Sequence, residues 1–200
     1  TIRDLYDRAF LKGSREAVLL LKDKIKGQMP VRVIGDYDAD GICSSYILKR
    51  GLEACGAVVD TMIPHRMKDG YGLNEHLVDE AYADGIDTIL TCDNGIAAYA
   101  QIEQAKKYGM TVIITDHHEI PYEEEPLAEP DPETGETSRR RYKIPPADVV
   151  IDPKQPGDTY PFQEICGAVV AFKLMQLLFA EFGFDGISTD LTSGKRSLLD

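Results

Sequence analysis

The sequence predicts an α/β fold with a doubly wound, mainly parallel five-stranded sheet and helices on both faces. Short apolar runs alternate with helical patterns from about Val31 onward. The runs are rich in Val and Ile without strict polar alternation, which is typical of strands buried on both faces of a parallel sheet. The expected strands span residues 31–35, 58–63, 87–92, 111–115 and 148–151.

The expected helices lie between these strands, which favours crossover connections over both faces of the sheet. They span residues 42–55, 74–84, 96–108 and 164–182. Before the first strand, SREAVLLLKDKIKG predicts an amphipathic helix with Ser14 as its N-cap and a capping-box pattern. We expect this helix to pack on the edge of the sheet. It belongs to an N-terminal helical extension, residues 1–29, that precedes a catalytic domain over residues 30–200.

Residues 121–146 interrupt the alternation of strands and helices. They are rich in Pro, Glu and Arg and contain a DPETGE turn, so we predict an insertion loop or a small hairpin. The run Arg139-Arg140-Arg141 is compatible with a role at the mouth of a substrate groove. A solvated loop is the favoured interpretation, because long surface loops vary freely.

Composition narrows the class of protein. The net charge of −12 counts against a simple nucleic-acid-binding module, so the acidic residues either hold cations or form a solvated surface. No apolar run approaches the roughly 20 residues needed to span a bilayer, and the N-terminus lacks a signal-peptide pattern. The scattered cysteines predict buried free thiols in a reducing cytoplasm rather than a zinc site or disulfides. They are Cys43, Cys55, Cys92 and Cys166.

Carboxylate and imidazole groups follow four of the five expected strands. Ligands of open parallel sheets bind outside the carboxyl ends of the strands, so these groups are expected to converge. Their mutual repulsion calls for compensation, and a pair of divalent cations provides it. Carboxylates with imidazole favour Mn²⁺, with Mg²⁺ as the alternative, and two such ions can drive phosphoryl displacement. The groups are Asp36, Asp38, Asp40, Asp93, Asp116, His117, His118 and Asp152.

Each motif also has a simpler explanation. Asp93 could be only the N-cap of the next helix. DYDADG could be a calcium loop, but the twelfth position, where an EF-hand needs Glu, is Ile47. The His117-His118 pair could lie on the surface. Taken together, in this order and each at a strand end, the motifs favour the metal site.

The motif order resembles that of the DHH phosphoesterase superfamily. Asp38-x-Asp40 is followed by Asp93 after a later strand and by Asp116-His117-His118 after the next one. Flanking segments resemble the RecJ type within that superfamily, namely VIGDYDADGICSSYIL, IPHRMKDGYGLN, TCDNGI, VIITDHHE and IDPKQPGDTYPFQEICGAVVAFKL. The resemblance implies a 5′-to-3′ single-stranded DNA exonuclease of DNA repair and recombination.

The resemblance also implies roles for individual residues. Asp38 and Asp40 would each ligate a different metal ion, and Asp93 would bridge the two ions. His117 would ligate the second ion. His118 would contact the scissile phosphate or protonate the leaving oxygen.

Other implied features lie further from the expected metals. Arg66 would clamp the phosphate, and residues 70–74 would shape the substrate groove. Many superfamily members carry His where Ile34 stands, and Asp36 is expected to compensate as a ligand or as a supporting group. The aspartate of the fourth motif is expected beyond Asp200, as is a DHHA1-type companion domain, which would leave the 200-residue chain inactive by itself.

Two other functions stay open. One keeps the site but changes the substrate to short oligonucleotides, nucleoside bisphosphates or cyclic dinucleotides. The other is a catalytically silent binding or scaffold protein of the same fold. Metal binding followed by hydrolysis of single-stranded DNA would separate the three. The expected partner is single-stranded DNA and not a membrane.

Overall fold

The computed structural model describes residues 11–64, 72–129 and 137–184 of the 200-residue chain. Its centre is a five-stranded sheet in which every pair of neighbouring strands is parallel. The strand order is β2-β1-β3-β4-β7. The strands are β1 (Val31–Ile34), β2 (Val59–Met62), β3 (Thr88–Cys92), β4 (Thr111–Thr115) and β7 (Val149–Ile151). The predicted fold class is confirmed.

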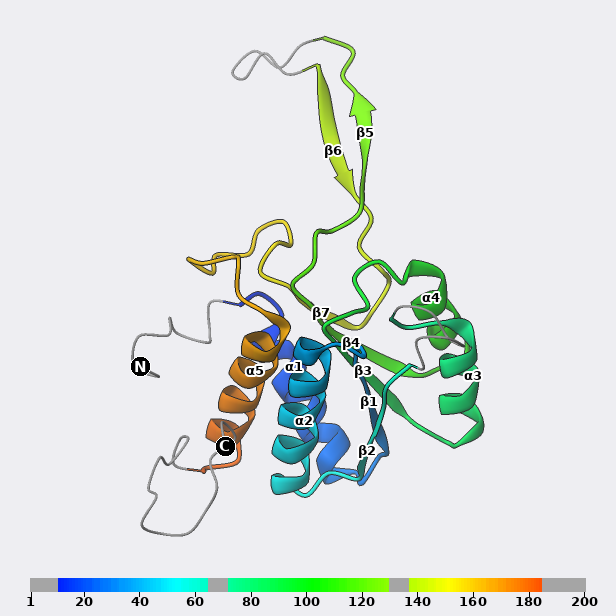
Figure 1. The fold of residues 1–200 in the computed structure, drawn as a ribbon, viewed down its shortest axis with the longest axis vertical. Helices are drawn as coiled ribbons and strands as arrows, with labels where there is room; N and C mark the ends of the chain where they lie inside the picture. Colours follow the sequence, from blue (N-terminus) through cyan, green and yellow to red (C-terminus); the bar gives the residue numbers. More distant parts are fainter. Residues whose placement is uncertain (1–10, 65–71, 130–136, 185–200) are drawn as a thin grey trace.

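Helices cover both faces of the sheet (Figure 1). Three of them share a core cluster with one face: α1 (Ser14–Lys26), α2 (Ala39–Ala54) and α5 (Gly167–Glu181). The other face is covered by α3 (Glu75–Ala83) and α4 (Tyr99–Lys107). The sheet is therefore doubly wound.

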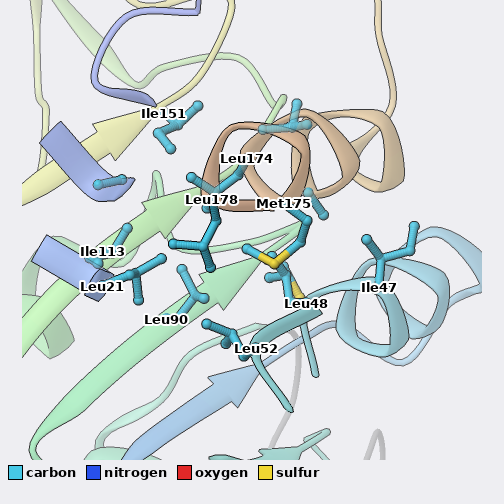
Figure 2. Close-up of a cluster of buried hydrophobic side chains, with 14 of the residues drawn as sticks. Leu21, Ile47, Leu48, Leu52, Leu90, Ile113, Ile151, Leu174, Met175 and Leu178 are labelled. Atoms are coloured by element: carbon cyan, nitrogen blue, oxygen red, sulfur yellow. The ribbon is translucent and has the colours of Figure 1, made fainter. Parts of the chain in front are cut away.

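The larger core cluster lies between the sheet and α1, α2 and α5. In Figure 2, Leu90 of β3 faces Leu52 of α2 and Leu178 of α5. Alternate strand residues such as Ile89 point instead to the smaller cluster under α3 and α4. Full burial of one such side chain contributes roughly 1.5–3 kcal/mol, so both faces hold the strands in place. The sheet is thus a rigid support for the loops at its carboxyl edge.

The start of α1 differs from the prediction. The N-cap is Gly13, which adopts the left-handed region with φ 81° and has no side chain to cap the helix. Ser14 is the first helical residue, and its Oγ donates to the carbonyl of Leu11 at 2.6 Å. A Cβ on Gly13 would lie 2.3 Å from the carbonyl oxygen of Val150, so the chain needs glycine there. The expected packing is confirmed, since α1 contacts α5 and the edge strand β7.

The insertion is a hairpin, one of the two forms predicted for it. Strands β5 (Tyr122–Pro126) and β6 (Ser138–Tyr142) pair antiparallel and project from the body on the side of the carboxyl strand ends (Figure 1). Polar residues form these strands because opposite charges face each other across them. Glu125 pairs with Arg139 at 2.9 Å, and Arg140 lies over the Tyr122 ring at 4.5 Å.

The cysteines agree only in part with the prediction of buried thiols. Cys55 and Cys92 are buried, but Cys43 and Cys166 are exposed, because they lie on the outer side of α2 and at the start of α5. Burial raises the pKa of the Cys55 thiol to about 11. Among the described helices, none has the length and apolar character to cross a membrane.

Candidate metal centre

The candidate site lies at the carboxyl ends of β1 and β3, where the order of the strands in the sheet changes direction. The chain passes from β1 to β2 on one side of β1, and then places β3 on the other side. Loops that leave the carboxyl ends of β1 and β3 therefore diverge, and an open α/β sheet binds its ligands at such a point. Asp36, Asp38 and Asp40 follow β1, and Asp93 follows β3. The topology alone thus brings the first two acidic motifs together.

The first motif forms the beginning of α2. Asp38 has an extended backbone, and its Oδ1 accepts a bond from the amide of Gly41 at 2.9 Å. This side-chain cap starts the helix at Ala39, three residues earlier than predicted. The calcium-loop alternative is excluded, because Ile47 at the twelfth position is buried in the helix core.

Asp93 adopts a left-handed backbone conformation with φ 59° and is 2% exposed. Aspartate tolerates this region better than most residues do. The residue does not act as a helix cap: α4 begins after Ala98, which makes no side-chain cap bond. Next to it, the Asn94 amide donates to the carbonyls of Ile34 and Cys92 and so ties the ends of β1 and β3 together.

The metal-binding residues predicted from the sequence converge in space. His117 Nε2 lies 3.0 Å from Asp93 Oδ1 and 3.5 Å from Asp40 Oδ2. One ligand atom each from Asp36, Asp38 and Asp93 lies within 4.8 Å of the other two. Asp93 belongs to both groups and therefore stands between the first motif and the histidines. The bridging role expected of Asp93 stays a prediction.

The electrostatics of the site favour a cation. Asp36 is 1% exposed, and neither of its carboxylate oxygens has a hydrogen-bond partner of ordinary geometry in the described part of the chain. Burial raises the pKa of Asp36 and of Asp93. No described Lys or Arg forms an ion pair with Asp36, Asp38, Asp40 or Asp93. The basic group placed against Asp93 and Asp40 is the His117 imidazole, whose pKa is raised by its hydrogen bond to Asp93. Buried carboxylates with so little positive charge beside them are costly, and oxygen donors together with an imidazole suit Mn²⁺ or Mg²⁺. The residues present therefore fit divalent cations.

His118 is held by a buried neighbour. Its Nδ1 lies 2.7 Å from Asp116 Oδ1, and this hydrogen bond raises the pKa of His118 to about 9. Asp116 is fixed in turn by the amides of His117 at 2.8 Å and Ile96 at 2.9 Å. The His118 side chain is 44% exposed, so a substrate can reach its ring. Sequence reasoning placed Asp116 among the converging carboxylates but did not assign it this supporting role.

Asp152, at the end of β7, is fully buried. Its Oδ1 accepts from the amide of Lys154 at 2.8 Å, while Oδ2 has no hydrogen-bond partner among the described residues. Burial raises the pKa of this carboxyl to about 7. The sequence placed it at a strand end, but nothing in its neighbours signals this degree of burial.

Other residues predicted from the sequence are not among the converging carboxylates and histidines that the structure describes. Ile34, which occupies the position of a histidine in many superfamily members, is buried in the core under α3 and α4 and does not face the carboxylates. In the segment 70–74, Leu73 is buried and Asn74 caps α3 through a bond to the amide of Leu77. Arg66 and the segment ending at Asp200 lie outside the described residues, so their expected roles stay predictions.

Comparison with known proteins identifies the family of the chain. The model of the DHH family, N-terminal domain, matches residues 30–194. The single-stranded-DNA-specific exonuclease RecJ of Bacillus subtilis is 40% identical over 89% of this chain and 20% of its own length. That of Thermus thermophilus is 37% identical over 86% of this chain and 22% of its own.

Solved structures of RecJ exonucleases have a similar fold. A crystal structure of exonuclease RecJ bound to manganese superposes with a TM-score of 0.71 at 35% identity, over 88% of this chain and 40% of that one. The manganese complex of RecJ from Thermus thermophilus gives 0.64 at 33% identity, over 88% of this chain and 22% of that one. The chain spans about a fifth of the two curated relatives named above. With its motifs, its topology and this family match in agreement, the chain belongs to the DHH family, whose N-terminal domain it contains.

Proposed function

We propose that this chain is the metal-binding catalytic part of a phosphodiesterase that removes nucleotides from single-stranded DNA. The observation that carries the proposal is the convergence of Asp40, Asp93 and His117 at the carboxyl ends of β1, β3 and β4. Beside them lies the buried Asp36, whose carboxylate oxygens have no hydrogen-bond partner of ordinary geometry among the described residues. The RecJ relatives, whose names describe single-stranded-DNA-specific exonucleases, support the choice of substrate. A 5′-to-3′ direction and a place in cytoplasmic DNA repair and recombination are part of the proposal.

The cofactors proposed are two divalent cations, Mn²⁺ in preference to Mg²⁺. Asp38 and Asp40 would each hold a different ion, Asp93 would bridge the pair, and His117 would hold the second ion together with Asp40 or Asp93. Asp36 would complete the site as a ligand or as a neighbouring negative charge. When bound, such a pair activates a water and stabilises the oxygens of an in-line phosphoryl displacement.

His118 would act on the substrate itself. In the metal-free chain, the hydrogen bond to Asp116 raises the pKa of His118 to about 9, which favours the protonated ring. Because Asp116 accepts the Nδ1 proton, the opposite Nε2–H group can contact a nonbridging phosphate oxygen or pass its proton to the leaving oxygen. Arg66 would add a second positive contact to the phosphate.

Manganese-dependent release of mononucleotides from 5′-labelled single-stranded DNA tests this function. The chain should be assayed at the length of its curated relatives, with Asp93→Asn as a control of nearly equal size. Release by the wild type that is lost in the control supports the nuclease. Cleavage of dinucleotides alone would move the assignment to small-substrate phosphatases, and Mn²⁺ binding without any hydrolysis would favour a scaffold.

A further inference from the structure

The first turn of α5 has no cap of its own. Cys166, at the N-cap, offers a thiol instead of a side-chain oxygen and makes no cap hydrogen bond of ordinary geometry. The first amides of any helix lack intrahelical acceptors, so they need partners from elsewhere. Here the amide of Gly167 donates to Asp40 Oδ2 at 2.7 Å, and that of Ala168 donates to Asp40 Oδ1 at 2.8 Å. The acceptor therefore comes from α2, 127 residues earlier in the chain.

The first turn of α5 also packs closely against Asp93. A Cβ placed on Gly167 would lie 2.9 Å from Asp93 Oδ1 and 3.0 Å from Asp93 Cβ. The φ of Gly167 is not positive, so its backbone does not require glycine, and the need arises from space alone. Asp93 cannot easily move aside, because it is buried and its amide donates to the Thr115 carbonyl at 3.0 Å.

We propose that the first turn of α5 is a positioning device for two ligands of the metal site. The amides of Gly167 and Ala168 orient the Asp40 carboxylate, and the missing side chain at Gly167 lets the helix lie directly against Asp93. Each Asp40 oxygen accepts one N–H and keeps a further lone-pair direction for a cation. Gly167 and Ala168 act through the aspartates and touch no reacting atom. The inference rests on the proposed metal site and adds to it the element that fixes its geometry.

A second glycine provides a matched control, because α2 and α5 also approach closely further along, near the end of α2 and the middle of α5. A Cβ on Gly51 would meet the Met175 side chain, with Sδ at 2.4 Å. This position is eleven residues after Asp40 on the same helix, about 16 Å away at 1.5 Å per residue. Gly51→Ala therefore disturbs the same helix pair without reaching the carboxylates. Ala168→Pro is a complementary variant: proline is tolerated in a first helical turn, and its ring would stand where Asp40 now accepts a bond.

The experiment measures Mn²⁺ affinity by calorimetry and metal-free stability by urea unfolding, for the wild type and the three variants. Gly167→Ala and Ala168→Pro should weaken Mn²⁺ binding about 10- to 100-fold, as losses of supporting groups around metal ligands do. Gly51→Ala should bind Mn²⁺ like the wild type even if its urea midpoint falls. A merely structural role would lower the midpoints and leave the affinity of the folded variants unchanged.

The outcomes are separable. Wild-type affinity in either folded variant, Gly167→Ala or Ala168→Pro, would overturn the positioning role while leaving the metal site intact. An equal loss of affinity in Gly51→Ala would also overturn it, because general helix packing would then be the cause. A wild-type chain that binds no Mn²⁺ would contradict the proposed metal site itself. If Gly167→Ala does not fold, Ala168→Pro still decides the matter.

Discussion

His118 and Asp116 form a short contact, 2.7 Å from Nδ1 to Oδ1, in which the carboxylate is buried and the imidazole faces solvent. In the metal-free chain this contact favours the protonated form of His118, whose pKa is raised to about 9. Asp116 is thereby the residue that makes His118 suitable for a phosphate. Both the charge of the ring and the stability of the fold should depend on this contact.

Asp116→Asn should lower the pKa of His118 from about 9 toward its ordinary value near 6.5. The neutral amide no longer favours the imidazolium, so the charge at neutral pH is largely lost. NMR titration of the His118 ring protons measures the change directly. A His118 pKa that stays near 9 in the variant would mean that another group holds the proton.

The same pair makes a contribution to stability that depends on pH. Because the folded pKa of His118 exceeds the unfolded value of 6.5, the contribution is complete below pH 6.5 and is lost as pH rises through about 9. Urea unfolding of the metal-free chain should show that the free energy of unfolding falls less between pH 6.5 and pH 9.5 in Asp116→Asn than in the wild type. Equal losses would contradict this linkage.

Asp152→Asn should stabilise the metal-free chain at pH 8. The wild-type carboxyl is fully buried with a pKa raised from 3.8 to about 7, so its ionisation costs stability as pH rises from about 4 through 7. The amide carries no charge and keeps an oxygen for the Lys154 amide. We expect a gain of at most about 4 kcal/mol in the free energy of unfolding at pH 8 and little gain at pH 4. A gain of equal size at both pH values would point to packing instead.

Ile34→His should destabilise the chain without adding a metal ligand. The side chain is fully buried among apolar residues under α3 and α4, so an imidazole there would lack a hydrogen-bond partner. The cost should be roughly 3 kcal/mol in the free energy of unfolding. Urea unfolding gives the cost, and Mn²⁺ calorimetry of the folded fraction should give wild-type affinity. Tighter Mn²⁺ binding would mean that position 34 faces the site.

Replacing residues 123–141 by Asn-Gly should leave the metal site unchanged. Tyr122 and Tyr142 are partners across the ribbon, so a two-residue turn can join them. Charged residues of the hairpin pair with each other, as Glu125 does with Arg139. The deletion therefore removes both partners of such a pair and leaves neither charge behind. We expect unchanged Mn²⁺ affinity and, in a chain of the length of its curated relatives, unchanged turnover of single-stranded DNA. A fall in turnover at constant Mn²⁺ affinity would instead place the hairpin at the mouth of the substrate groove.

Hydrophobic patterning predicts the sheet well and the helix starts poorly. Runs such as TVIIT at 111–115 occur as expected because they are buried on both faces. The first turn of α2 was missed because Asp38 caps it, and α5 starts at Gly167 because Asp40 binds its first amides. The second of these contacts joins segments that are distant in the sequence. No local pattern could have revealed it.

The candidate site was predictable to a similar degree. Parallel strands bring their carboxyl ends to one edge, so the convergence of Asp40, Asp93 and His117 follows from the order of the motifs. What could not be predicted depends on packing. The left-handed backbone of Asp93, the full burial of Asp152 and the steric demand at Gly167 all arise from neighbours that only the folded chain supplies.

The most direct test of the central claim is a crystal structure of the chain grown with Mn²⁺, with anomalous scattering used to locate the ions. We expect two peaks about 3.5–4 Å apart, with the Asp93 carboxylate between them and His117 beside one. The same crystals of Asp93→Asn should lose at least one peak. Peaks elsewhere in the molecule, or none near Asp93, would contradict the assignment of this edge of the sheet as a metal centre.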